Sequence, residues 1–216
     1  DNGVMMRLEE TEGLGTHIFN SKDLNLSGHI REILESGAVD ALKIEGRTKS
    51  NYYAGITARA YRAAIDDYYA KRDNSAFYIN ELNTLKNRGF TDGYLVHRPY
   101  EKLNTQNHLT AISEGSYQVN AEVDESGEWA MCRHTIRVGE SKEIVMPFDA
   151  DVACGKSEIG EIYKENGVKM MRFDRICLQN GKELDSIHSG NTNAFKLPLP
   201  LPPFSFLRQK TLPDTI

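Results

Sequence analysis

The chain has 216 residues, of which 39% are apolar, and a formal net charge of -5 at pH 7. This length accommodates one large or two ordinary domains, and the apolar content is enough for a packed core. No apolar run approaches the ~18 residues of a membrane-spanning helix, and the negative charge argues against a generally basic surface that binds nucleic acid.

Two features bear on the cellular compartment. The cysteines Cys132, Cys154 and Cys177 are an odd number at wide spacings, which fits neither a disulfide framework nor a paired-thiolate metal site. We therefore expect reduced thiols and a cytoplasmic protein. The sequence begins at Asp1 with no export signal, but a chain that starts without Met is expected to be a piece of a longer one, so secretion is not excluded.

Two strand-helix units are predicted first. Strands at residues 15–23 and 39–47 are followed by helices at 26–37 and 49–72, with Ser27 as an N-cap and Gly37 as a C-cap glycine. Apolar residues recur at helical spacing in both helices: Ile30, Ile33, Leu34, Tyr53, Ile56, Ala60, Ala64 and Tyr68. Such units favour a parallel α/β sheet. Two units cannot cover both faces of that sheet, so an upstream segment or a partner is expected to complete it.

The character of the chain changes after a third predicted helix at residues 76–89. From about residue 116, short β-rich runs alternate with Gly-containing turns, which indicates a small antiparallel β-barrel or sandwich. We place the boundary at residues 104–115. The expected domains are residues 1–105 and 112–208, followed by a tail at 209–216. The proline-rich stretch LPLPLPPF is expected to be an extended strap or a linker.

Polar residues gather where the two predicted strands end. Lys22 and Asp23 follow the first strand, and Lys43, Glu45 and Arg47 close the second. Because ligands meet parallel sheets at the carboxyl ends of the strands, we expect these residues at one mouth. In a closed barrel, Lys43 and Glu45 would both point inward. The alternative is an internal ion pair with a purely structural role.

The same stretch carries a local excess of positive charge. Five basic residues and one acid lie between Lys43 and Arg62, which is typical either of a phosphate-binding patch or of a solvated helix face. A nucleic-acid interface needs cations and stacking groups. Both are supplied by Arg47, Lys49, Tyr52, Tyr53, Arg59 and Arg62. The two tyrosines are equally suited to helix packing.

Three segments together resemble a known family. FNSKDL, then ALKIEGRTKSNYYAGITARAYRAAID, then NRGFTDGYL is similar to the collagenase-like peptidase family, a group of peptidases of unassigned catalytic type. The resemblance covers residues 1 to about 105, and the β-rich remainder resembles the family's C-terminal extension more loosely. It implies that residues 1–105 are the last strand-helix units of a TIM-like barrel. It also implies an upstream cysteine cluster with a metal or iron-sulfur centre, so no cofactor is expected within this chain.

The resemblance implies two activities, namely hydrolysis of collagen or other peptides and hydroxylation of a wobble uridine in transfer RNA. The residues give little support to a peptidase, because HExxH and GxSxG are absent and the histidines show no paired ligand spacing. Ser21 and Lys22 are adjacent on an extended chain and would point to opposite faces.

We nevertheless assign the chain to a hydrolase, the C-terminal part of a collagenase-like peptidase with unknown catalytic residues, inactive as a fragment. Transfer RNA hydroxylation and a non-catalytic RNA- or protein-binding module are the alternatives. The expected partners are a peptide or collagen, transfer RNA, or a second copy of the chain, and no membrane. The candidate substrate-binding residues are Lys22, Asp23, Lys43, Glu45, Arg47, Lys49 and Tyr52.

Overall fold

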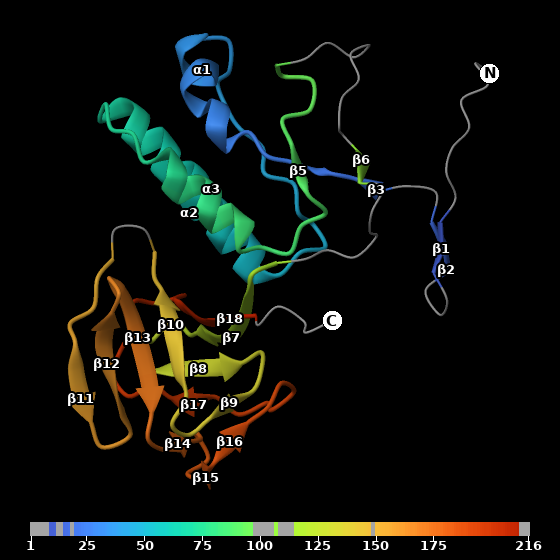
Figure 1. The fold of residues 1–216 in the computed structure, drawn as a ribbon. Helices are drawn as coiled ribbons and strands as arrows, with labels where there is room; N and C mark the ends of the chain where they lie inside the picture. The colour runs from blue at the N-terminus through green and yellow to red at the C-terminus, as the bar shows by residue number, and fades with distance from the viewer. Residues whose placement is uncertain are drawn as a thin grey trace. The chain divides into compact units, whose positions relative to one another are not determined.

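The structure is a computed structural model that describes residues 9–11, 15–17, 20–96, 106–107, 115–147 and 150–211. Contacts divide the chain into two compact units, unit 1 over residues 1–116 and unit 2 over residues 117–216. Figure 1 shows the helices within unit 1 and the large β-sheet within unit 2.

Unit 1 has three α-helices among its described residues, α1 (Ile30–Glu35), α2 (Asn51–Tyr69) and α3 (Ser75–Asn83), and a 3-10 turn at Ser27–His29 precedes α1. Its strands are short and pair in three places. β1 (Glu9–Thr11) pairs antiparallel with β2 (Gly15–His17), and β3 (Asn20–Ser21) with β6 (Gln106–Asn107). The parallel pair joins β4 (Asp23–Leu24) to β5 (Phe90–Thr91).

The helices of unit 1 lie where the apolar periodicity predicts them, with shorter bounds. α2 begins after Ser50, whose Oγ accepts a hydrogen bond from the Tyr53 backbone N–H at 3.2 Å. Its buried face includes Ile56, Ala60 and Ala64, as predicted. Gly37 follows α1 with a φ of +61°, a left-handed conformation that favours glycine.

The N-cap prediction for the first helix was wrong. The N-cap positions are Leu26 for the 3-10 turn and His29 for α1, and neither has a side-chain cap hydrogen bond; the Asn25 Oδ1 accepts a hydrogen bond from the Ser27 backbone N–H at 3.0 Å. The Ser27 hydroxyl is buried and has no hydrogen-bond partner in the described part of the chain. A serine at the start of an apolar period predicts an N-cap, but the 3-10 turn places Ser27 inside the first turn.

The second predicted strand, residues 39–47, is not a strand in this structure. Residues 41–46 are irregular and belong to no sheet among the described residues. Their apolar side chains, with those of nearby Val39 and Leu24, are exposed. A strand needs a neighbour that satisfies its backbone groups, and the described chain provides none here. What is observed is therefore a mixed fold of three helices and an antiparallel sheet.

Unit 2 is built on one eight-stranded antiparallel sheet, in the order β11-β12-β13-β10-β18-β7-β8-β17. Its strands are β7 (Tyr117–Val123), β8 (Trp129–Cys132), β10 (Ser141–Val145), β11 (Gly155–Ser157), β12 (Gly160–Glu165), β13 (Val168–Phe173), β17 (Phe195–Lys196) and β18 (Phe206–Lys210). Two small pairs accompany it, β9 (Ile136–Arg137) with β16 (Ser186–Ile187) and β14 (Ile176–Cys177) with β15 (Glu183–Leu184). The antiparallel prediction is confirmed, but β11 and β17 do not pair, so the described sheet is not a closed barrel.

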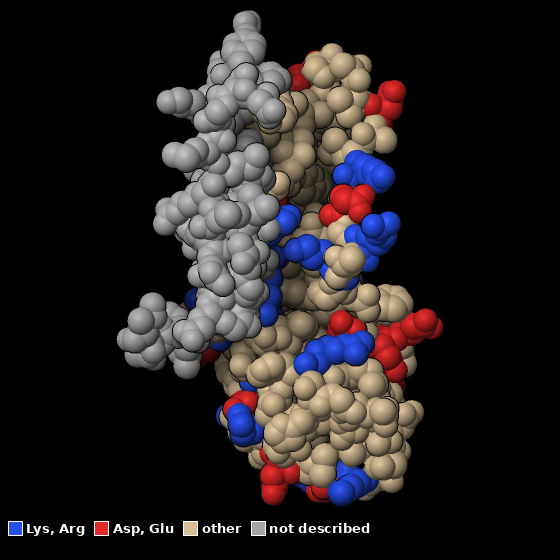
Figure 2. Space-filling view, turned by 90° about the vertical axis from the view of Figure 1, so that its right-hand side faces the viewer, with Lys and Arg blue, Asp and Glu red and all other residues tan. Residues whose placement is uncertain are grey.

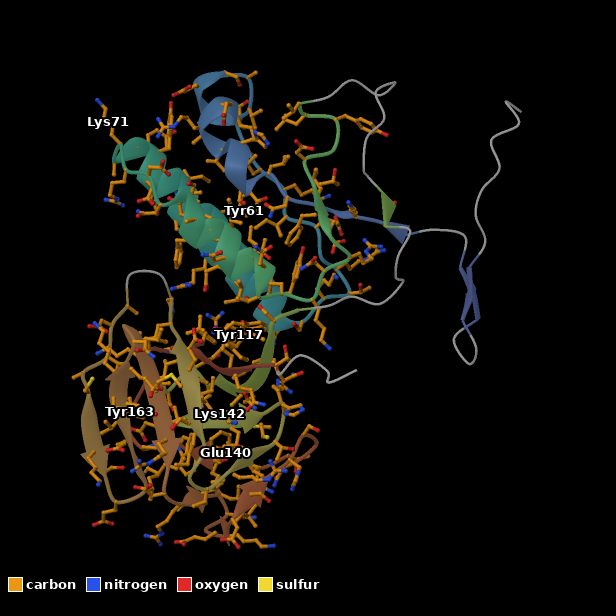
Figure 3. The ribbon with its side chains drawn as sticks, viewed as in Figure 1. Tyr61, Lys71, Tyr117, Glu140, Lys142 and Tyr163 are labelled. Carbon is orange, nitrogen blue, oxygen red and sulfur yellow. The ribbon has the colours of Figure 1, made fainter. Side chains whose placement is uncertain are left out.

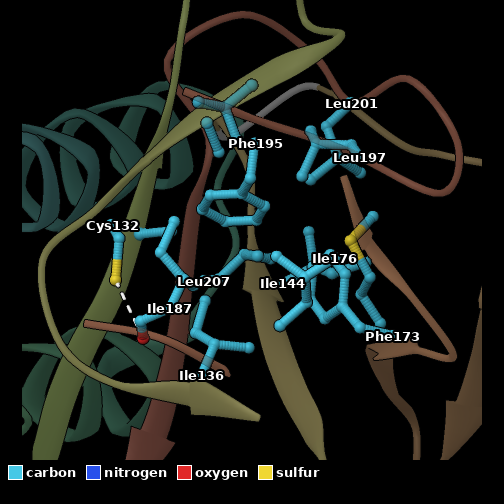
Figure 4. Packing of buried hydrophobic residues seen from close by; sticks show 14 of the residues in the cluster. Cys132, Ile136, Ile144, Phe173, Ile176, Ile187, Phe195, Leu197, Leu201 and Leu207 are labelled. Carbon is cyan, nitrogen blue, oxygen red and sulfur yellow. Dashed lines mark hydrogen bonds between the residues drawn. The ribbon is translucent and has the colours of Figure 1, made fainter. Parts of the chain in front are cut away.

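One apolar cluster forms the core of unit 2 (Figure 4). The rings of Phe173 and Phe195 meet edge to face with centroids 5.6 Å apart. Cys132 is buried among aliphatic side chains, and its Sγ donates hydrogen bonds to the carbonyls of His134 and Ile187. Burial raises the pKa of this thiol to about 11, so Cys132 is a core residue and not a reactive thiolate.

The proline-rich stretch is a strap that packs on this core. Leu197 and Leu201 are buried, and their backbone N–H groups donate to the carbonyls of Glu128 and Gly127, both at 2.9 Å. The last strand, β18, continues to Lys210, which pairs with Tyr117. The register of its pairing with β7 shifts between Leu207 and Arg208.

No helix in the described segments is long and apolar enough to cross a membrane. The domain ranges 1–105 and 112–208 stay a prediction, and most of the expected boundary at residues 104–115 lies outside the described residues.

We expect limited proteolysis to cut first between Asn104 and Ser116 and to leave a resistant β fragment, since exposed connections are cleaved before packed units. Mass spectrometry of the early products checks this. Simultaneous degradation of both units at many sites would count against two independently folded domains.

Candidate functional site

Unit 1 contains a cavity of about 810 Å³ beside α2. Its walls are formed by residues 41–49, by residues 22–24 and by one face of α2 that carries Tyr53, Thr57 and Tyr61. This volume falls within the ~300–1,000 Å³ that is usual for small-molecule sites. Three of the elements predicted to carry a ligand thus come together at one place.

The loop before α2 is held against the cavity by Tyr53. The Tyr53 hydroxyl donates a hydrogen bond to the Glu45 carbonyl at 3.2 Å, and the Lys49 Nζ lies 5.4 Å from the ring centroid. A Cβ atom on Gly46 would lie 2.5 Å from the Tyr53 ring, so only glycine permits this approach without a shift of the ring. Gly46 therefore permits the close packing of the Tyr53 ring against the loop that precedes Arg47.

Lys43 and Glu45 lie in the cavity wall but do not point into a protein interior. Their side chains are 87% and 73% exposed, and Lys43 Nζ lies 3.8 Å from Glu45 Oε2. The expectation that a closed barrel would turn both side chains inward stays a prediction, because residues 41–46 have no sheet neighbour in the described part of the chain. An exposed pair of this kind contributes about 0–1 kcal/mol to stability.

Asp23 and Tyr52, two of the predicted site residues, have structural contacts. Asp23 accepts hydrogen bonds from the Arg88 side chain, with Nη2 at 2.6 Å, and from the Arg88 backbone N–H. This joins β4 to the turn that enters β5. Tyr52 is buried between helices with its hydroxyl 3.5 Å from Thr84 Oγ1, and it does not line the cavity.

Positive charge is concentrated around the cavity. Its walls contain six basic residues and two acids: Lys22, Lys43, Arg47, Lys49, Arg62, Arg88, Asp23 and Glu45. Figure 2 shows Lys and Arg side chains (blue) gathered beside a hollow of unit 1, with acidic side chains (red) among them. Since the whole chain carries a net charge of -5, this surface differs in sign from the molecule's average.

The basic residues of the α2 region differ in whether an acidic side chain forms an ion pair with them. Arg59 turns to α3, where it pairs with Glu81 and lies over the Phe77 ring. Arg62 pairs with Asp66 one turn along α2. In the described part of unit 1 no acidic side chain forms an ion pair with Lys22, Arg47 or Lys49, so these three are the cations best placed for an anionic ligand.

The sequence reasoning missed several cavity residues, among them Thr57, Tyr61 and Arg88. The Tyr61 hydroxyl accepts a hydrogen bond from the Leu26 backbone N–H at 2.8 Å and donates one to Asn25 Oδ1 at 3.3 Å. Burial raises the pKa of Tyr61. The spacing of four residues from Tyr53 through Thr57 to Tyr61 was a usable signal, since it defines one helix face.

The described residues do not fit a metal or iron-sulfur centre. Nowhere among them do three His, Cys, Asp or Glu side chains come together as a set of ligands. The three cysteines are free thiols, of which Cys132 is buried, Cys177 is half-buried and Cys154 is exposed. We therefore derive no reaction step through such a group from these residues.

Comparison with known proteins identifies relatives along the chain. It is 58% identical over 208 residues to tRNA hydroxylation protein P of Helicobacter pylori strain 26695, covering 96% of this chain and 49% of that protein. It is 35% identical over 136 residues to the protein of that name from Escherichia coli K12, covering 62% and 30%. The chain spans about half the length of the Helicobacter relative. No solved structure shows a significant match.

These relatives overturn the assignment to peptide or collagen hydrolysis. Proteins that match this chain over 62% to 96% of its length are named for tRNA hydroxylation, and none of these names describes a peptidase. The predictions of a hydrolase, protease or collagenase were therefore wrong. The sequence had already offered no nucleophile or metal-bound water for that reaction.

The family itself was predicted correctly. The model of Peptidase family U32 matches residues 4–105, the range that carries FNSKDL, KIEGR and the long helix. The match contains every residue that lines the basic cavity. Residues 4–105 therefore carry a domain of peptidase family U32, and the C-terminal β unit lies beyond the matched residues.

Proposed function

We propose that this chain is part of a tRNA-hydroxylating protein and that its basic cavity binds the RNA. The observation that carries the proposal is the 58% identity over 96% of the chain to a protein named for tRNA hydroxylation. A tRNA-modifying role also supports the cytoplasm as the compartment. The residues described here supply substrate binding, and we assign them no step of oxygen transfer.

The charges at the cavity suit a phosphate backbone. Arg47 and Lys49 lie directly before α2, whose first N–H groups and dipole favour an anion at the same place. The guanidinium fork of Arg47 can bind two oxygens of one phosphate, which an ammonium group cannot do. Lys22 adds a third cation from the other wall.

We also propose that unit 1 forms the last strand-helix units of a TIM-like barrel. Val39, Leu42 and Ile44 are exposed although they are apolar, as expected for a segment that packs against further strands. The relatives' greater length would supply those strands. In such a barrel Lys43 and Glu45 would face the interior, and Arg47 would stay at the mouth.

RNA binding should fall steeply with salt, because each phosphate contact releases counterions. We expect the wild-type chain to bind tRNA with a linear decrease of log K against log salt. Arg47→Gln should reduce the slope by about 0.7–0.9, the value for one lost phosphate contact, and Arg47→Lys should weaken binding with little change of slope. Filter binding or fluorescence anisotropy at several salt concentrations measures both.

Lys182→Gln is the matched control, since Lys182 lies at an exposed turn of unit 2 and lines no part of the cavity. The Lys182→Gln variant should bind tRNA with the affinity of the wild type and with the same slope of log K against log salt. An equal loss in Lys182→Gln and Arg47→Gln would show general charge attraction, and a flat salt dependence would contradict phosphate binding altogether.

A further inference from the structure

A buried hydroxyl in the wall of the cavity has no partner. Thr57 is 5% exposed, lines the cavity, and its Oγ1 makes no hydrogen bond within the described part of the chain. A helical threonine commonly bonds the carbonyl one turn before it, and Thr57 does not. Leaving a buried hydroxyl unpaired costs stability, so an adjacent ligand that pairs with it is the natural explanation.

An aromatic ring held rigidly in place lies one helical turn further along the same wall. Both hydrogen bonds of the Tyr61 hydroxyl, to Leu26 and Asn25, fix its orientation. Figure 3 shows Tyr61 on α2 beside the strands of unit 1. A ring that is already fixed loses little entropy when a flat group packs on it, and RNA bases are commonly bound by such stacking.

The cavity therefore joins two kinds of chemistry along α2. Its cations Arg47 and Lys49 precede the helix, and Thr57 lies six residues into it, about 9 Å along the axis. Ile65 and Leu26 add apolar surface near Tyr61. A charged end, a hydrogen-bonding group and a flat apolar wall in this order match the phosphate, the base edge and the base face of one nucleotide.

We propose that the cavity receives one unstacked nucleotide of the RNA, with its base beside Thr57 and Tyr61 and its phosphate on Arg47 and Lys49. Enzymes that modify a base must take it out of its stack and read it in a pocket. Thr57 is then a specificity-determining residue that hydrogen-bonds the edge of the base. This inference rests on the proposed binding of RNA by the same cavity.

The experiment compares a six-nucleotide single-stranded RNA of mixed sequence with an abasic strand of equal length and charge. We expect the wild-type chain to bind the base-bearing strand about tenfold more tightly, equivalent to ~1.4 kcal/mol. Thr57→Val, which removes the hydroxyl and keeps the shape, should reduce this preference about fivefold. Its affinity for the abasic strand should stay within twofold, and Thr57→Ser should restore the preference.

Ser27→Ala is the matched control. Ser27 carries another buried hydroxyl without a partner in the described chain, but it lines a different and smaller cavity. Its removal should leave the preference for bases unchanged. Neither Ser27→Ala nor Thr57→Val should lower the melting temperature, because each removes a buried hydroxyl that has no hydrogen-bond partner in the described chain.

The outcomes separate the inference from the proposed function. Equal binding of both strands by the wild type, or an unchanged preference in Thr57→Val, would overturn the nucleotide pocket and leave RNA binding intact. If the chain binds neither of the two strands and does not bind tRNA, the proposed function itself is overturned. A free nucleoside monophosphate that binds as tightly as the base-bearing strand would overturn the assignment of the ligand to RNA.

Discussion

Replacing Asp67 by alanine should lower the free energy of unfolding of unit 1 by about 3 kcal/mol. The Asp67 side chain is 3% exposed and accepts hydrogen bonds from Tyr78 Oη, Asn74 Nδ2 and Arg72 Nε. These contacts join the end of α2 to α3. The substitution leaves the buried Tyr78 hydroxyl without its acceptor, and ~3 kcal/mol is a large part of a typical domain stability of ~5–15 kcal/mol.

The neighbouring residue gives the control. Asp66 is half-buried and pairs with Arg62 on the surface of the same helix, so Asp66→Ala should cost no more than ~0.5 kcal/mol. All the α-helices that the structure describes lie in unit 1, so urea unfolding followed by circular dichroism at helical wavelengths monitors this unit. Similar losses in both variants would show that the contacts of Asp67 are not what joins the helices.

The same contacts give a dependence on pH. The hydrogen bond from Tyr78 is the main cause that lowers the pKa of Asp67 below its ordinary value of 3.8, and those from Asn74 and Arg72 act in the same direction. A carboxyl group with a lowered pKa in the fold stabilises it above the unfolded value, and this stabilisation is lost as the pH falls through the folded value. The difference between wild type and Asp67→Ala should be complete at pH 7 and shrink below about pH 4.

Replacing Glu143 by alanine should lower the free energy of unfolding of unit 2 by about 3–5 kcal/mol. Arg208 has a side chain only 5% exposed, and its Nε donates to Glu143 Oε1 at 3.0 Å across the β10–β18 pair. Its guanidinium also lies 4.3 Å from the centroid of the Tyr117 ring. Without Glu143, the buried guanidinium would lose the carboxylate that pairs with it across β10 and β18.

Glu161→Ala is the counterpart on β12. Glu161 pairs with Arg172 at 2.8 Å, but the Arg172 side chain is 38% exposed and can regain water, so the loss should stay below ~1 kcal/mol. The single tryptophan, Trp129, lies on β8 and reports unit 2 by its fluorescence. Equal effects of the two substitutions would mean that burial of the Arg208 guanidinium carries no special cost.

Local patterns in the sequence predicted much of the fold. The apolar spacing along α2 depends only on residues within a few turns, and so do Gly37 at the end of α1 and the Gly-containing turns of unit 2. Residues 41–46 illustrate the limit. Their composition predicts a strand, but strand formation depends on a neighbour elsewhere in the protein.

The sequence indicated which segments come together at the candidate site, but not what each residue in them contacts. Tyr52 and Tyr53 are adjacent, and a turn of about 100° between them decides that Tyr52 enters the helix core while Tyr53 holds the loop. Asp23 looked like a ligand-binding acid because its partner Arg88 lies 65 positions away. Pairings over such distances leave no local signal in one sequence.

The exposed segment before Gly46 has a consequence for handling the protein. A stretch that has exposed apolar side chains and no strand partner in the described part of the chain is a template to which another extended chain can add as a β-strand, so two copies can associate through it. Lys43 and Glu45 interrupt the apolar residues with opposite charges and so act as gatekeepers against aggregation. Neutralising both should make this chain precipitate at concentrations where the wild type stays dispersed.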